Sequence, residues 1–248
     1  MRLRSAELLK LRTTRVTYIL LGVTVLLSGL AAAAIVGSGS LDGDDWLQLA
    51  QGAGFSTTLA TIVGILLVTN EYRHGTIMTT FLAEPRRVRV GAAKLAAALV
   101  AGIVLAVASI ATTALVALPW AAARGEGLHL QGQAGEAVAR VLLAFALSAA
   151  LGAAVGAIIQ NQVGTIIAVF VWFLIVESII GVLSALVFGD LGEPDPVSPY
   201  LPGSALSGII GGEGSEFMLR GGPAALLALG YVALLSVVGA LSMTRRDP

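Results

Sequence analysis

The chain has 248 residues, of which 56% are apolar and 12% are charged, with 15 Lys and Arg against 15 Asp and Glu. An ordinary soluble domain carries roughly 25% charged residues, so a soluble protein could not keep this much apolar surface in water. The sequence therefore predicts an all-α integral membrane protein in a single domain. It has no Cys, which excludes disulfides, thiolate metal sites and cysteine nucleophiles.

Six apolar runs have about the length that a helix needs to cross roughly 30 Å of hydrocarbon. They are residues 16–36, 53–69, 95–118, 138–159, 163–188 and 224–243. The second run is short unless Asn70 and Glu71 extend its helix into the headgroups, and we expect Pro119 to close the third. The sequence thus predicts six transmembrane helices.

Lys and Arg residues indicate the orientation of these spans, because they favour the cytoplasmic side. With the N-terminus inside, twelve of the fifteen lie on the cytoplasmic face, and Arg124, Arg140 and Arg220 lie outside. The outer loops are acidic instead. This distribution predicts a multi-pass protein of the cell membrane with both termini in the cytoplasm.

Two segments outside the spans have open interpretations. Residues 1–15, MRLRSAELLKLRTTR, predict an interfacial helix, although a basic anchor that only sets topology would have the same composition. After the fifth span, four prolines between residues 194 and 202 rule out a continuous helix. Short apolar pieces at 206–210 and 217–219 then suit a pair of short extracellular helices, or else a plain exposed loop.

The most polar segment inside the apolar chain is residues 70–94, NEYRHGTIMTTFLAEPRRVRVGAAK, with five of the fifteen Lys and Arg. Gly75 and Thr76 offer a break and a helix start, and Pro85 offers an end. The apolar residues between them share one helical face: Ile77, Met78, Phe81 and Leu82. We therefore expect a short helix beneath the membrane, which binds either lipid headgroups or another protein.

Glu177 lies near the middle of the fifth span, where a carboxylate costs about 2.5–3.5 kcal/mol by insertion scales. It should face protein or water rather than lipid. It would either contact a cationic or polar substrate in a cavity, or form a protonated carboxyl group that is hydrogen-bonded between helices. Trp172 and Phe173 lie one turn away and would line the same cavity or only pack. Small residues at a four-residue spacing in the fourth span predict close helix packing: Ser148, Gly152 and Gly156.

The sequence EYRHGT at residues 71–76, followed by FLAEPRR and then Lys94, resembles the pattern of ABC-2-type transporter permeases. The start AELLKLRTTR, the six spans and the segment PYLPGSAL before the last span are also similar to that family. The resemblance implies a coupling helix between spans two and three that fits a cleft of a separate ATPase subunit. The residues that it implies for holding the helix are Glu71, Arg73, Gly75 and Thr76, and for its docking face Met78, Phe81 and Leu82. It implies a second, minor contact at residues 160–162.

What the resemblance implies is the non-catalytic permease subunit of an ABC exporter for a hydrophobic or amphiphilic compound such as a drug, lipid or peptide. The sequence has no GxxxxGK[ST] motif, and neither Lys10 nor Lys94 follows a glycine-rich turn. We therefore expect no cofactor on this chain, with ATP and Mg on the ATPase. The expected partners are that ATPase, a second permease copy in a homodimer or heterodimer, and membrane lipid, but no nucleic acid. The alternative is a membrane scaffold or receptor that recruits a cytoplasmic partner without transport.

Overall fold

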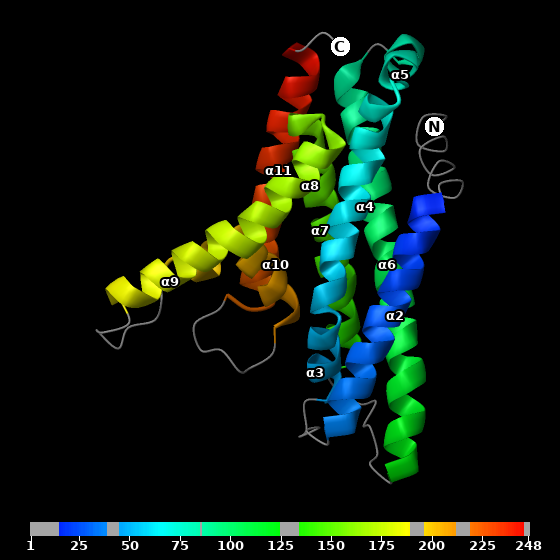
Figure 1. Cartoon of the computed structure of the whole chain (residues 1–248), viewed down its shortest axis with the longest axis vertical. Helices are drawn as coiled ribbons and strands as arrows, with labels where there is room; N and C mark the ends of the chain where they lie inside the picture. Colours follow the sequence, from blue (N-terminus) through cyan, green and yellow to red (C-terminus); the bar gives the residue numbers. More distant parts are fainter. Residues whose placement is uncertain are drawn as a thin grey trace.

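The computed structural model describes residues 15–38, 45–84, 86–124, 134–188, 196–211 and 219–245, and their regular elements are all helical (Figure 1). The long single helices are α2 (Arg15–Ser38), α4 (Gly54–Arg73), α6 (Arg87–Arg124), α7 (Ala134–Ile159) and α11 (Gly222–Arg245). The short ones are α3 (Asp45–Gly52), α5 (Ile77–Ala83), η3 (Ser198–Tyr200) and α10 (Pro202–Ile210). One further long helix consists of α8 (Gln162–Phe170), the π-helical stretch η1 (Val171–Val176) and α9 (Glu177–Phe188).

Five helices of the described part are long and apolar enough to cross a membrane. They are α2, α6, α7, the continuous helix α8–η1–α9, and α11. This confirms the prediction of an all-helical, multi-pass membrane protein. Helix α4, where we expect the second span, is not one of the five, so the sixth span stays a prediction. The interfacial helix expected at residues 1–15 falls almost wholly outside the described residues, as do Pro85 and most of the apolar piece at 217–219.

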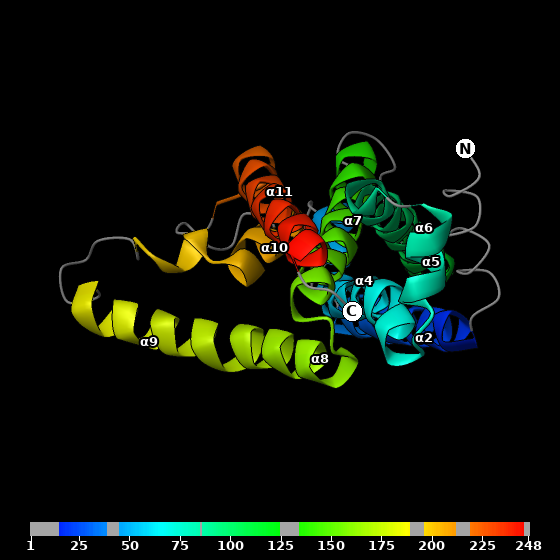
Figure 2. The ribbon, with the colours of Figure 1, turned by 90° about the horizontal axis from the view of Figure 1, so that it is seen from above.

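Helix α7 is the centre of the bundle and packs against α4, α6 and α11 (Figure 2). Its contact with α4 is made at two glycines. A Cβ atom on Gly64 of α4 would lie 1.9 Å from the carbonyl oxygen of Ala149, and one on Gly152 of α7 would lie 2.1 Å from that of Thr61. The two backbones therefore touch, as the small residues of the fourth span predict.

Helix α4 carries several of its polar side chains into the bundle. Ser56, Thr61 and Thr69 are all buried. Between α2 and α6, the hydroxyl oxygens of Ser28 and Ser109 lie 2.7 Å apart, and Ser28 lies 3.3 Å from Ser56 of α4. These buried hydroxyl groups have hydrogen-bond partners within the protein, so this part of α4 needs none from its surroundings.

Two helix ends bear on the predicted spans. Helix α4 continues through Asn70 and Glu71 to Arg73, which confirms the extension that the short second run needs. Helix α6 begins at Arg87, before the expected start at Leu95, and passes through Pro119. The expectation that Pro119 closes this helix is therefore wrong. A proline removes one backbone hydrogen bond, but three of the five residues that follow it are alanines, which favour helix and let it continue to its end.

The helix α8–η1–α9 diverges from the bundle at a steep angle (Figures 1 and 2). Its first part, α8, packs against α4 and α7, and its last part, α9, contacts η3. The side chain of Asn161 fixes its start by accepting a hydrogen bond of 2.9 Å from the backbone N–H of Gly164. Along α9 the apolar side chains are mostly exposed, including Val182, Leu186 and Val187. This helix thus presents a long apolar surface away from the rest of the chain.

Candidate functional site

The turn between α4 and α5 is a Schellman motif, and Gly75 makes it possible. The backbone N–H of Thr76 donates to the carbonyl oxygen of Glu71 at 3.0 Å, and that of Gly75 donates to Tyr72 at 3.3 Å. Gly75 has a φ of +68°, the left-handed conformation that a glycine adopts without strain. The break that the sequence predicts at Gly75 and Thr76 is therefore confirmed, and it sends the chain back across the end of α4.

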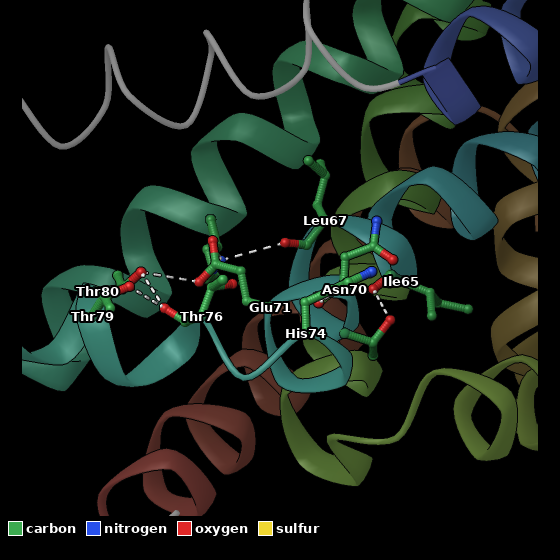
Figure 3. A network of polar contacts seen from close by, with 10 residues as sticks. Ile65, Leu67, Asn70, Glu71, His74, Thr76, Thr79 and Thr80 are labelled. Atoms are coloured by element: carbon green, nitrogen blue, oxygen red, sulfur yellow. Dashed lines mark hydrogen bonds and ion pairs between the residues drawn. The ribbon is translucent and has the colours of Figure 1, made fainter.

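A buried ion pair holds this turn in place. The Oε1 atom of Glu71 lies 2.7 Å from Nζ of Lys94, and their side chains are 9% and 1% exposed. Oε2 of the same carboxylate accepts a hydrogen bond of 3.3 Å from the hydroxyl of Thr80 in α5 (Figure 3). Lys94 also donates to the carbonyl oxygen of Leu67 at 3.4 Å. A charged hydrogen-bonded cluster thus joins α4, α5 and α6.

Helix α5 is attached on one side and open on the other. Ile77 is buried and Thr80 is bound to Glu71, whereas Met78 is 49% and Leu82 85% exposed. Phe81 differs from these two, because the guanidinium carbon of Arg87 lies 5.0 Å from the centre of its ring. Two of the three residues predicted for a docking face are therefore exposed, and the third packs against α6 through a cation–π contact.

Two further contacts join helix ends near α5. The guanidinium of Arg73, at the end of α4, donates to the side-chain oxygen of Gln162 at 3.0 Å, where α8 begins. The guanidinium of Arg87 donates to the carbonyl oxygen of Met243 in the last turn of α11 at 2.8 Å. The turn after α4, the short loop before α8 and the end of α11 therefore lie at one end of the molecule (Figure 1).

A family model described as ABC-2 family transporter protein matches residues 3–177, which is most of the chain and includes α5 and the ion-pair cluster of Glu71, Thr80 and Lys94. The chain belongs to the ABC-2 transporter family. A search of the curated proteins finds no match. Membership makes the chain a membrane component of an ABC transporter, in a family whose permeases work with an ABC ATPase and are generally not catalytic themselves.

In this ABC-2 family member, Glu177 is hydrogen-bonded between two elements. Its Oε1 atom accepts one hydrogen bond from the indole N–H of Trp172 and one from the backbone N–H of Gly203, each of 2.8 Å. Gly203 lies in the first turn of α10, so the carboxyl group links the diverging helix to that helix start. Glu177 and Phe173 also line a cavity, whereas Trp172 touches the site through Glu177. Glu177 thus accepts hydrogen bonds from two elements and also lines a cavity, whereas its contact with a substrate and the protonation of its carboxyl group stay predictions.

The sequence does not identify two members of the ion-pair cluster, Lys94 and Thr80, as site residues. A signal for Lys94 is present, because it is one of only two lysines and directly precedes an apolar run. A buried lysine needs an anionic partner. Glu71, at the end of the preceding apolar run, is a candidate for that partner. Thr80 carries no such signal, since its role depends on how α5 folds back.

Proposed function

We propose that this chain is the permease subunit of an ABC exporter and that a separate ATPase subunit docks on α5. The observation that carries the proposal is the buried ion pair of Glu71 and Lys94, with Thr80 bound to the same carboxylate. These contacts attach a short exposed helix to two long ones. A force applied to α5 by a closing ATPase would therefore move α4 and α6 with it, instead of bending a loose loop.

The exposed side of α5 supports a protein partner. Leu82 is 85% exposed on the side that faces away from the bundle, with Met78 beside it. Covering apolar side chains is favourable by about 25 cal/mol per Å². Lipid headgroups are the competing partner for this surface, because Arg86 and Arg89 are also exposed nearby. Loss of ATPase binding on Leu82→Asp distinguishes a protein partner from lipid headgroups.

We further propose that the chain has six spans and both termini in the cytoplasm. Helix α4 would cross the membrane inside the bundle, where its buried hydroxyl groups meet α2, α6 and α7 rather than lipid. The basic residues Arg73, Arg87 and Arg245 lie at the end of the molecule that carries α5, which favours the cytoplasmic side for that end. Two permease copies would enclose the pathway, and the apolar helices suit a hydrophobic or amphiphilic compound.

The test is co-purification with an ABC ATPase encoded beside this chain, followed by ATP hydrolysis in lipid. We expect a stable complex in which the permease changes the ATPase turnover several-fold, and loss of the complex when Leu82→Asp is introduced. A chain that neither binds the ATPase nor alters its turnover would contradict the proposal and favour a scaffold that recruits another partner. Export from vesicles of a panel of amphiphilic compounds then identifies the substrate.

A further inference from the structure

A cavity of about 410 Å³ lies between α4, α7 and the diverging helix, with η3 and α10 on one side. Its size is within the range of ligand sites, roughly 300–1,000 Å³. Most of the residues that line it are Ser or Thr, which is unusual in so apolar a chain. They include Thr57, Thr58 and Thr61 from α4 on one side, and Ser178, Ser204 and Ser207 from α9 and α10 on the other.

Several of these hydroxyl groups have already used their hydrogen as a donor. Thr57 donates to the carbonyl oxygen of Gly54 at 2.6 Å, Thr61 donates to Thr57 at 3.3 Å, and Ser178 donates to Leu174 at 2.7 Å. A hydroxyl has one donor and two acceptor lone pairs, so what these side chains can still offer is an acceptor. These three hydroxyl groups therefore favour a ligand that donates hydrogen bonds.

The charge of the cavity also favours a ligand that donates hydrogen bonds. Glu177 lines it, and no Lys or Arg is among the described residues that do so. Trp172 and Gly203 both donate to Oε1, which fixes the position of the carboxyl group. A carboxylate has about four acceptor positions, so capacity remains for another donor. A carboxylate that is partly removed from bulk water is stabilised by a nearby cation, and a ligand can supply that cation.

Ser148 of α7 is an independent indication of a ligand. Its side chain lines the cavity and is 1% exposed, and its hydroxyl oxygen has no hydrogen-bond partner within the described residues. Buried hydroxyl groups are almost always hydrogen-bonded, because an unpaired one costs free energy. A polar group in the cavity would satisfy it.

From these contacts we propose that the cavity binds the protonated amine of an amphiphilic cation. The ammonium group donates to Glu177 and to hydroxyl oxygens of the wall, and Phe173 offers an aromatic surface to the same group or to its apolar neighbour. That such a cation is the compound exported rests on the function proposed above. Binding itself needs no ATPase and is tested without one.

The experiment uses Trp172 as the reporter, because its indole N–H is bonded to Glu177. The chain has three tryptophans, so replacing Trp46 and Trp120 by Phe leaves one. The full chain in lipid nanodiscs is titrated with decylammonium, decanol and decanoate. We expect a saturable change in fluorescence with decylammonium at a concentration at least ten times lower than with the other two. If the double variant does not fold, calorimetry of the unaltered chain with the same three probes takes its place.

Three variants make the result specific. Glu177→Gln keeps an oxygen for Trp172 and Gly203 but removes the charge, so the tenfold preference should disappear. Ser148→Ala should weaken decylammonium binding several-fold. The control is Ser236→Ala, which removes a buried hydroxyl that also lacks a partner in the described residues but lines a different cavity, and it should leave binding unchanged.

Equal affinities for decylammonium and decanol would overturn the proposal, and so would a preference that survives Glu177→Gln. Either result would leave the assignment as a permease standing, since no ATPase is present. Conversely, selective binding by a chain that recruits no ATPase would keep the cation site and remove the link to transport.

Discussion

Glu71 and Lys94 form an ion pair of 2.7 Å in which both side chains are more than nine-tenths buried. Thr80 donates to the same carboxylate, so a single charged cluster fixes a helix of seven residues against two long ones. Burying two charges is costly unless they are paired and further hydrogen-bonded. The position of α5 and the pairing of these charges therefore depend on each other.

Lys94→Met should strongly destabilise the protein, because it keeps the length of the side chain but leaves Glu71 buried without a cation. Loss of one partner of a buried pair typically costs about 3–5 kcal/mol. The double variant Glu71→Gln/Lys94→Met removes both charges and should recover much of that loss. Thermal unfolding of the purified variants in lipid measures both. Equal melting temperatures for the single and double variants would show that the two charges are not coupled.

Leu82→Asp should abolish binding of the ATPase while leaving the melting temperature unchanged, because the side chain is almost fully exposed. Phe81→Ala should do the reverse: it loses the contact with Arg87, worth about 0.5–2 kcal/mol, and keeps the exposed face of α5. Co-purification and thermal unfolding of both variants test this. Val88→Asp, an equally drastic change at an exposed residue of α6, is the control and should retain the ATPase. A Leu82→Asp protein that still binds it would assign this surface to lipid headgroups.

Gly64→Ala should separate α4 from α7, since the added methyl group would lie 1.9 Å from a backbone oxygen that cannot easily move. Overpacking of this kind typically costs about 1–3 kcal/mol, and backbone contact places the site at the upper end. Gly230→Ala is the matched control: its methyl group meets nothing within 4 Å, so the change should be neutral or stabilising by up to about 1 kcal/mol. The measurement is the melting temperature of the two variants. Similar values would argue against close contact of α4 and α7.

Gly203→Ala should displace Glu177, because its methyl group would lie 2.5 Å from Oε2 of that carboxylate. We expect a shifted emission of Trp172, which loses its acceptor, and weaker binding of decylammonium by about tenfold. Gly54→Ala is the control at the same cavity, with nothing within 4 Å of the added methyl group. If the emission of Trp172 stays unchanged in the Gly203→Ala protein, the link between the diverging helix and α10 is not maintained through Glu177.

The parts of this molecule that the sequence predicts well depend on local signals. Gly75 needs a positive φ, and the apolar residues after it repeat with helical spacing, so the turn and α5 follow from a short stretch of chain. The long apolar runs are also local signals. They predict helices because a membrane span must form the hydrogen bonds of its backbone within itself. Gly152 likewise predicts a close helix contact, but the sequence does not show which helix it contacts.

The parts that the sequence does not predict depend on which helices meet. In the sequence, Lys94 lies at the end of a polar segment, which predicts a loop. It is buried because α6 begins before the expected start of the span and passes beside α4. Phe81 and Leu82 are neighbours in one apolar pattern, but Arg87 covers one and not the other. The divergence of α8–η1–α9 has no signal either, because a helix that is apolar on every side does not indicate which side is covered.

The central position of α7 has a consequence for how the protein is made. The chain leaves the ribosome from its N-terminus, so α4 is synthesised before the helix that it touches most closely. Until Gly152 has emerged, the face of α4 that holds Thr61 and Gly64 has no α7 backbone to pack against. Assembly of the earlier helices is therefore completed only when α7 arrives, and a ribosome that stalls before it leaves the most polar of the long helices without its main partner.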